Sequence, residues 1–181
     1  MGADLNPTAM RAILALGLAA TLLLAPLHAP AQAQIPHLAT GKADLVIVRK
    51  GARSLQLIRA GAVIKSYRIA LGRDPAGPKR REGDGRTPEG VYTLDWRNSN
   101  SNFYRSIHVS YPREGDGQHA ERWGVSPGGS IMLHGLPNGV PADRLGHPYV
   151  DWTDGCIALT NQEIDEIWTQ VEDGTTIIIY P

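Results

Sequence analysis

Short runs of apolar and β-branched residues, separated by glycine-containing turns, are the feature that most constrains the fold of this chain. Three such runs follow one another at residues 45–48, 55–59 and 63–71. Runs separated by only a few turn residues form hairpins, so this part of the chain predicts an antiparallel meander. Later strand-like runs lie at residues 91–96, 103–111, 131–133 and 175–180. The sequence therefore predicts a mainly β domain with the character of an antiparallel β-sandwich.

One main α-helix is predicted shortly after residue 156. Thr160 and Glu163 have the spacing of a capping box, and Asp173-Gly174 is a typical stop. The apolar residues between them fall on one helical face; they are Ile164, Ile167, Trp168 and Val171. Residues 113–129 and 137–152 show no such pattern, and we expect two long loops there, a type of segment that is usually functional or mobile.

The N-terminal residues have the pattern of an export signal. Arg11 precedes the apolar stretch 12–25, which is too short to span a bilayer, and small residues precede a cleavage point after Ala33. An uncleaved membrane anchor is the alternative. We therefore divide the chain into a signal peptide (1–33), a lead-in segment (34–43) and one catalytic domain (44–181), and expect export to the periplasm or cell envelope.

The charges of the chain balance, with 18 Lys and Arg against 18 Asp and Glu. Binding to nucleic acid needs a surplus of positive charge, so we do not expect a nucleic-acid partner. The three basic residues at 79–81 form a local exception. They are interpreted as a solvated loop tip, with the steering of an anionic glycopeptide polymer as the alternative. We expect a monomer.

The single cysteine of the chain, Cys156, has no intramolecular disulfide partner. Cysteines of small exported domains usually occur in pairs, and an unpaired thiol is open to oxidation there. A function that needs the thiol is therefore favoured over a buried, inert cysteine. The preceding Gly155 lets a substrate approach the backbone closely, and the N–H groups of these two residues are candidate oxyanion donors.

A thiol attacks a carbonyl as the thiolate, so a cysteine nucleophile needs a base. His134 is the best candidate, because it ends a strand-like apolar run and precedes Gly135. His147 is the second candidate, since it lies in the segment that leads to Cys156. His108 alternates inside a strand, which favours a structural role. No tight ligand spacing such as His-Glu-x-x-His appears, so we expect neither a metal nor another cofactor.

These residues resemble the L,D-transpeptidase catalytic domain, also called the YkuD domain. The family motif reads His-Gly, a variable gap, Ser/Thr-His-Gly-Cys, a hydrophobic residue and a nearby Asn. This chain has His-Gly at 134–135, Thr-Asp-Gly-Cys-Ile at 153–157, and Asn161. Residues 83–90 (Gly-Asp-Gly-Arg-Thr-Pro-Glu-Gly) also resemble the turn before the middle strands of the family. The resemblance extends over about residues 45–181 and implies the YkuD fold.

The resemblance implies specific roles for the residues of the motif. Cys156 would be the nucleophile and His134 its general base. Gly135 takes the position whose backbone carbonyl orients the imidazole, and Gly155 belongs to the loop that supplies the oxyanion donors. The residues expected around the bound substrate are Thr153, Asp154, His147 and Asn161. Of these, Asn161 is also well placed to help cap the helix.

Two positions depart from the family pattern. Asp154 stands where the family has its second histidine, and Ala158 where an arginine is frequent. An inward-pointing carboxylate would raise the pKa of the thiol, unless it pairs with His147 or an arginine. The Asp-Gly-Cys variant resembles the YafK-like subgroup, in which some members resemble hydrolases of peptidoglycan cross-links or protein anchors.

The resemblance implies acyl transfer on peptidoglycan stem peptides. The thiol would attack the carbonyl of the third residue, a diamino acid, and expel the D-alanine that follows it. An amine acceptor would then give a cross-link, with an envelope protein as a further acceptor or released anchor. Water as acceptor would instead make the protein an L,D-carboxypeptidase or endopeptidase. An inactive peptidoglycan-binding module is the alternative from another functional class.

Overall fold

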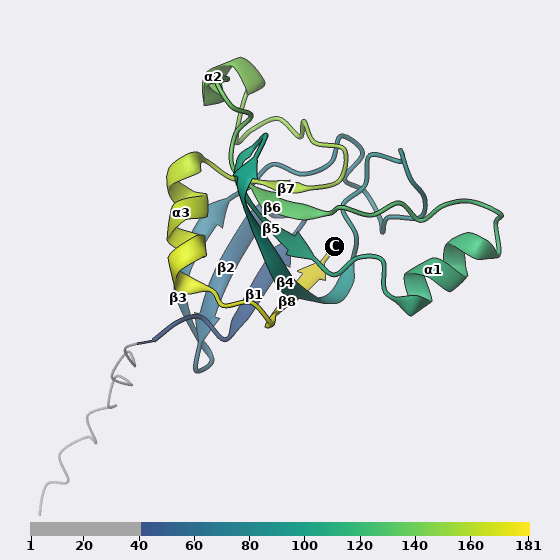
Figure 1. The fold of residues 1–181 in the computed structure, drawn as a ribbon, viewed down its shortest axis with the longest axis horizontal. Coiled ribbons are helices and arrows are strands. Elements are labelled where there is room, and N and C mark those ends of the chain that lie inside the picture. Colours follow the sequence, from purple (N-terminus) through teal and green to yellow (C-terminus); the bar gives the residue numbers. More distant parts are fainter. Residues whose placement is uncertain (1–40) are drawn as a thin grey trace, which may run out of the picture. The chain divides into compact units, whose positions relative to one another are not determined.

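The computed structural model describes residues 41–181, so the predicted signal peptide and most of the lead-in segment lie outside the described residues. The described part contains eight strands and three helices (Figure 1). The strands are β1 (Leu45–Arg49), β2 (Ser54–Arg59), β3 (Ala62–Arg68), β4 (Gly90–Ser101), β5 (Tyr104–Val109), β6 (Met132–His134), β7 (Ile157–Ala158) and β8 (Thr175–Tyr180). The helices are α1 (Glu114–Glu121), α2 (Ala142–Leu145) and α3 (Asn161–Gln170). No helix among residues 41–181 is long and apolar enough to cross a membrane.

All eight strands join one curled sheet in the order β3-β2-β1-β8-β4-β5-β6-β7. The predicted meander is confirmed, because β1, β2 and β3 pair antiparallel in sequence order. The sheet as a whole is mixed, however: β8 runs parallel to β1, and β7 runs parallel to β6. The mainly β fold with one main helix is thus confirmed, while the strands form one curled mixed sheet and not a purely antiparallel one.

Strand alternation places the core on one face of the sheet. Val46 and Val48 of β1 are fully buried, and the intervening Ile47 is only half-buried. Ile177 and Ile179 of β8 repeat this pattern on the adjacent strand. Side chains two residues apart point to the same face, so these strands contribute a continuous apolar layer. The buried layer supports β4, β5 and β6, which carry the cavity described below.

Helix α3 packs against β5 and β6 (Figure 1). Its capping box is present as predicted: Thr160 Oγ1 accepts the N–H of Glu163, and the Glu163 carboxylate accepts the N–H of Thr160 at 2.8 Å. Ile164 and Ile167 are fully buried on its inner face. The cap and these two buried side chains stabilise the helix that follows the cysteine loop.

The prediction of an unstructured loop at residues 113–129 is wrong, because this segment contains α1. The helix has the sequence EGDGQHAE, and Ala120 is its single buried residue. A polar helix with two glycines has no apolar stripe to detect, which is why periodicity did not reveal it. In Figure 1 this helix extends away from the sheet, at the opposite end of the domain from α3. The second expected loop, residues 137–152, contains only the single-turn helix α2.

Candidate active site

His134 is the last residue of β6 and is held rigidly. Its Nδ1 lies 2.7 Å from the carbonyl oxygen of Gly135. A carbonyl only accepts, so Nδ1 carries the proton and Nε2 keeps its lone pair. The ring also packs against Phe103 and Trp152, with centroid distances of 4.6 and 5.6 Å. The orientation that the family resemblance implied for Gly135 is thus the geometry found here.

The burial of His134 keeps its imidazole neutral. The residue is only 3% exposed. Burial lowers the pKa of His134 to about 4, although the hydrogen bond to Gly135 opposes the shift. A nearby His147 lowers this pKa further. At neutral pH the free Nε2 is therefore a proton acceptor, as a general base must be.

Cys156 lies immediately before β7 and beside β6. The parallel register pairs Leu133 with Ile157 and His134 with Ala158. Extending this register by one residue sets Cys156 beside Met132, two positions before His134. Residues two apart on a strand point to the same face, so thiol and imidazole share one face of the sheet. The register of two short strands thus brings together residues that are far apart in the sequence.

The Cys156 thiol is neutral in the resting protein. It is partly exposed, and its Sγ–H donates to the carbonyl oxygen of Ser130 at 3.6 Å. Burial raises the pKa of Cys156, and the charge of Asp154 raises it further. A backbone hydrogen bond from Met132 and the charge of Lys79 act in the opposite direction without overcoming burial. With the imidazole also neutral, thiol and base do not form an ion pair at rest.

Both side chains line one cavity of about 650 Å³. One wall is aromatic and includes Phe103 and Trp152, and Arg73 lies at the cavity as a positive charge. The sequence did not predict a role in the site for these three residues. Trp152 had a signal, since it directly precedes the cysteine motif, whereas Phe103 and Arg73 are distant in sequence and had none.

The loop before Cys156 is fixed by its own hydrogen bonds. Thr153 Oγ1 donates to the Cys156 carbonyl at 2.8 Å and accepts the Gly155 N–H at 3.1 Å. Gly155 has φ +134°, and a Cβ there would meet the Arg86 carbonyl oxygen at 2.6 Å, so only glycine fits. Because the Gly155 N–H is engaged within the loop, the N–H of Cys156 is the better candidate for the oxyanion donor.

Asp154 points outward, with its side chain 82% exposed. Its carboxylate pairs with Arg73 at 2.8 Å, which is one of the two arrangements that would limit its effect on the thiol. Both residues line the cavity, so this ion pair lies at its rim. Asp154, at the position of the family histidine, is therefore a paired surface carboxylate beside the cavity and not a buried charge next to the thiol.

Asn161 positions the backbone after His134. Its Oδ1 accepts the N–H of Leu136 at 2.9 Å, while the cap of α3 is made by Thr160. A Cβ at Gly135 would lie 2.7 Å from the same Oδ1, so the amide packs directly against the glycine. Asn161 is not among the residues that line the cavity. The geometry supports a positioning role and gives no support to the predicted substrate contact.

His147 is likewise set back from the cavity. It is 6% exposed, and its Nδ1 accepts the indole N–H of Trp152 at 3.4 Å. Burial lowers the pKa of His147. The prediction that His147 lines the cavity is wrong, because Trp152 lines the cavity and the His147 ring lies behind it. Within residues 41–181 no cluster of three or more His, Cys, Asp or Glu side chains is arranged to hold a metal ion.

Comparison with known proteins identifies a family for this arrangement. Residues 43–179 match the model of the L,D-transpeptidase catalytic domain, YkuD. "Putative L,D-transpeptidase YafK" of Escherichia coli K12 is 30% identical over 129 residues, covering 66% of this chain and 44% of that protein. The chain thus spans less than half the length of this curated relative.

Two solved structures share the fold. The helical cell shape determining protein Pgp2 of Campylobacter jejuni aligns with a TM-score of 0.58 and 25% identity, covering 77% of this chain and 48% of that one. Bd1075 of Bdellovibrio bacteriovorus aligns with a TM-score of 0.53 and 24% identity, covering the same shares. With the family model matching most of the sequence, the chain belongs to the L,D-transpeptidase catalytic domain (YkuD) family.

Proposed function

We propose that this protein is a peptidoglycan L,D-transpeptidase in which Cys156 is the nucleophile and His134 the general base. One observation carries the proposal: the thiol and an imidazole with a free Nε2 line the same open cavity. Membership of the L,D-transpeptidase family supports the choice of a stem peptide as substrate. The pattern of residues 1–33 supports a site of action in the periplasm or cell envelope.

The reaction follows from the two side chains. Nε2 of His134 takes the thiol proton as Sγ of Cys156 attacks the carbonyl carbon of the third stem residue, a diamino acid. The N–H of Cys156 donates to the oxyanion of the tetrahedral intermediate. The C–N bond to D-alanine then breaks, and the imidazolium returns the proton to the leaving amine. The product of this half-reaction is a thioester on Cys156 and free D-alanine.

The second half-reaction resolves the thioester. An amine of another stem peptide attacks its carbonyl, and His134 accepts a proton from that amine. The C–S bond then breaks, and the imidazolium returns the proton to the leaving sulfur, which regenerates the thiol. The new amide is the cross-link. Water in place of the amine gives the hydrolytic outcome, in which the stem peptide is shortened or an anchored protein is released.

The neutral resting pair defines the type of catalysis. A preformed thiolate–imidazolium pair requires a lowered thiol pKa and a raised histidine pKa, and both shifts here are in the opposite direction. Proton transfer is therefore coupled to the attack, as in general-base catalysis by a histidine. Such a site stays protonated and less open to oxidation until a substrate occupies it.

Incubation with purified muropeptides tests the proposal. We expect disaccharide-peptide dimers lacking one D-alanine, formed by wild-type protein and absent with Cys156→Ser, which keeps the shape of the side chain. Shortened or released monomers in place of dimers would assign the hydrolytic reaction to the same residues. Substrate binding without any product, unchanged in Cys156→Ser, would contradict catalysis and identify a binding module.

A further inference from the structure

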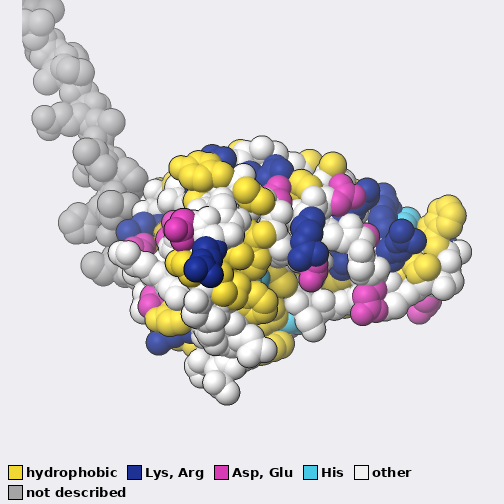
Figure 2. All heavy atoms as spheres, turned by 90° about the horizontal axis from the view of Figure 1, so that it is seen from above, with side chains coloured by type: hydrophobic (Ala, Val, Ile, Leu, Met, Phe, Trp, Pro, Cys, Tyr) yellow, Lys and Arg dark blue, Asp and Glu magenta, His cyan; other side chains and the backbone are white. Residues whose placement is uncertain are grey.

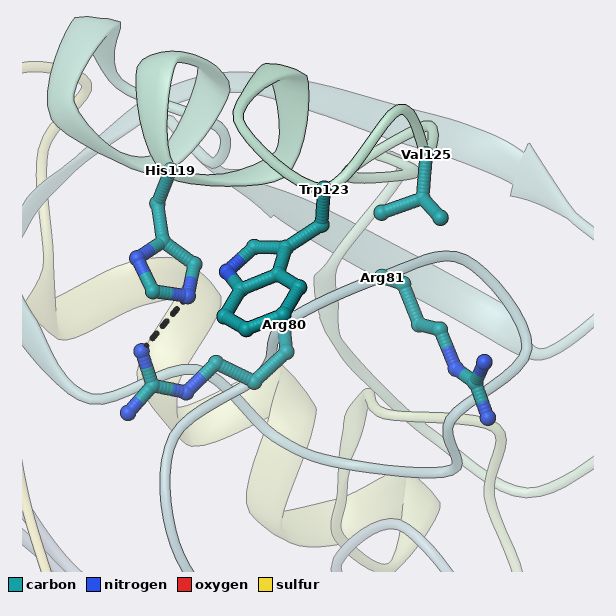
Figure 3. A pocket seen from close by; sticks show the side chains of 5 residues that line it. All are labelled: Arg80, Arg81, His119, Trp123 and Val125. Atoms are coloured by element: carbon teal, nitrogen blue, oxygen red, sulfur yellow. Dashed lines mark hydrogen bonds between the residues drawn. The ribbon is translucent and has the colours of Figure 1, made fainter.

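A separate hollow lies between the loop at residues 79–86 and α1. Its volume is about 540 Å³, within the range of small-molecule sites. It is lined by Arg80, Arg81, His119, Trp123 and Val125. Figure 3 shows the indole of Trp123 between His119 and Val125, with the guanidinium group of Arg80 directed at His119. None of these residues lines the cavity around Cys156.

Positive charge gathers around this hollow, and its arginines form no ion pair with a carboxylate of residues 41–181. Arg80 lies 2.8 Å from His119 Nε2, and Arg122 lies 3.4 Å from His119 Nδ1. A neutral imidazole has one accepting nitrogen, so it can accept from only one of these two guanidinium groups. Within residues 41–181, no ion pair includes Arg80, Arg81 or Arg122. Figure 2 shows Lys and Arg side chains beside a histidine and hydrophobic groups at the α1 end of the molecule.

A buried ion pair fixes the loop that presents the two arginines. The Lys79 ammonium lies 2.8 Å from Asp84, and their side chains are 3% and 8% exposed. Asp84 Oδ2 also accepts the backbone N–H groups of Arg80 at 2.7 Å and Arg81 at 3.1 Å. Asp84 is thus occupied by Lys79 and by backbone donors, so it does not neutralise the guanidinium groups. The loop is preorganised while its arginine side chains stay available.

Trp123 supplies a flat apolar surface beside these charges. It is 74% exposed, although an indole normally buries most of its area. An exposed indole at the edge of a hollow offers a ligand a large rigid surface for stacking. The combination of an aromatic face with planar guanidinium groups suits a ligand that has both an apolar ring face and an anionic group. A saccharide with a carboxylate or phosphate has both.

The segments that border this hollow also border another one at the candidate active site. A third hollow of about 320 Å³ is lined by Lys79, Glu82, Gly128 and Ser130 and reaches Cys156. The Glu82 N–H donates to the carbonyl of Ser126 at 2.8 Å, and this hydrogen bond joins the loop at residues 79–86 to the segment after α1. The same two segments therefore border the hollow at Trp123 and the thiol. A polymer held at the hollow would therefore lie on the same two segments that border Cys156.

We propose that the hollow between α1 and Arg80-Arg81 binds an acidic saccharide unit of a glycan polymer. One face of the sugar ring stacks on Trp123, and its carboxylate or phosphate pairs with Arg80, which lies on the His119 side of the indole, while Arg81 on the other side adds positive charge to the hollow (Figure 3). The inference rests on the proposed function in one respect, since the polymer is then peptidoglycan, whose acidic units are those without a stem peptide on the lactyl carboxylate, or those that carry a phosphate. The concave shape of the site favours a saccharide over a membrane surface.

Titration calorimetry of the full chain tests this inference with defined probes. We expect N-acetylmuramic acid (carboxylate) or N-acetylglucosamine 6-phosphate (phosphate) to bind at least about tenfold more tightly than neutral N-acetylglucosamine, as expected for a charge-assisted contact. Trp123→Ala, and the double change Arg80→Gln with Arg81→Gln, should each weaken binding by about tenfold or more. Trp96→Ala and Arg49→Gln remove an exposed indole and an exposed charge elsewhere, and should leave binding unchanged.

The arginine substitutions are suited to this test because Asp84 contacts the backbone and not the guanidinium groups. Equal binding of the charged and neutral sugars, equal binding by variants and wild type, or binding to anionic vesicles but to neither acidic sugar would overturn the inference. Repeating the titration with Cys156→Ser separates the two proposals. Saccharide binding by a protein that forms no product supports this inference alone, and product formation without saccharide binding supports the proposed function alone.

Discussion

Lowering the pH should destabilise the fold through His134, because the unfolded chain binds a proton that the folded chain excludes. The folded pKa is about 4, against an ordinary value of 6.5. Between these two values the unfolded state is protonated at this residue and the native state is not. Stability is therefore highest above about pH 6.5 and decreases as the pH falls towards 4.

The size of the effect follows from the difference between the two pKa values. A shift of about 2.5 units corresponds to roughly 3 kcal/mol of unfolding free energy, at about 1.4 kcal/mol per unit. About 2 kcal/mol of this is lost between pH 7 and pH 5. His134 is 3% exposed, so little of this effect is screened by solvent.

Urea unfolding at several pH values measures this effect. The same series on His134→Gln removes the titrating ring and leaves the other ionisable groups in place, so the difference between the two proteins isolates His134. We expect the variant to lose about 2 kcal/mol less than wild type between pH 7 and pH 5. An equal loss in both proteins, or an NMR titration of His134 near its ordinary pKa, would refute the burial argument.

Three further predictions concern the cysteine loop and its supports. Gly155→Ala should destabilise the protein by about 3 kcal/mol or more in a denaturation experiment, because its Cβ would meet a backbone oxygen 2.6 Å away. Gly139→Ala, also at positive φ but with nothing within 4 Å of the new Cβ, should cost only about 1 kcal/mol. Asn161→Ala should lower the free energy of unfolding by about 1–3 kcal/mol in the same assay, because it leaves the Leu136 N–H without its acceptor. It should also lower turnover, because the turn after His134 is no longer held; equal turnover would refute the positioning role. The rate at which iodoacetamide alkylates Cys156, measured by mass spectrometry, should keep rising with pH through the alkaline range, because burial raises the thiol pKa. A rate that is already constant at neutral pH would contradict the neutral thiol and imidazole.

Local pattern was sufficient to predict much of the fold. The meander of β1 to β3 and the capped helix α3 depend on turns, alternation and a capping box, all of which lie within short stretches of sequence. The insertion of β8 between β1 and β4 depends on pairing between distant segments, so local pattern could not reveal it. Helix α1 could not be predicted either, because it buries almost no residue and so has no apolar periodicity.

The candidate site divides in the same way. The motif around Cys156 and His134 predicted two residues that the structure places in one cavity. Sequence spacing could not show that Asp154 turns outward to Arg73, or that Asn161 reaches the backbone at Leu136, because both contacts depend on how distant loops pack. His147 also lies near the cysteine motif in the chain, yet Trp152 separates it from the cavity.

The most direct test of the account is the intact mass of the protein after brief exposure to a tetrapeptide stem substrate. We predict a covalent adduct with the mass of the stem peptide minus D-alanine, located on Cys156 by peptide mapping and absent in Cys156→Ser. His134→Gln should form this adduct far more slowly. An adduct on another residue, or product formation that persists in Cys156→Ser, would contradict the central claim that this thiol carries the acyl group.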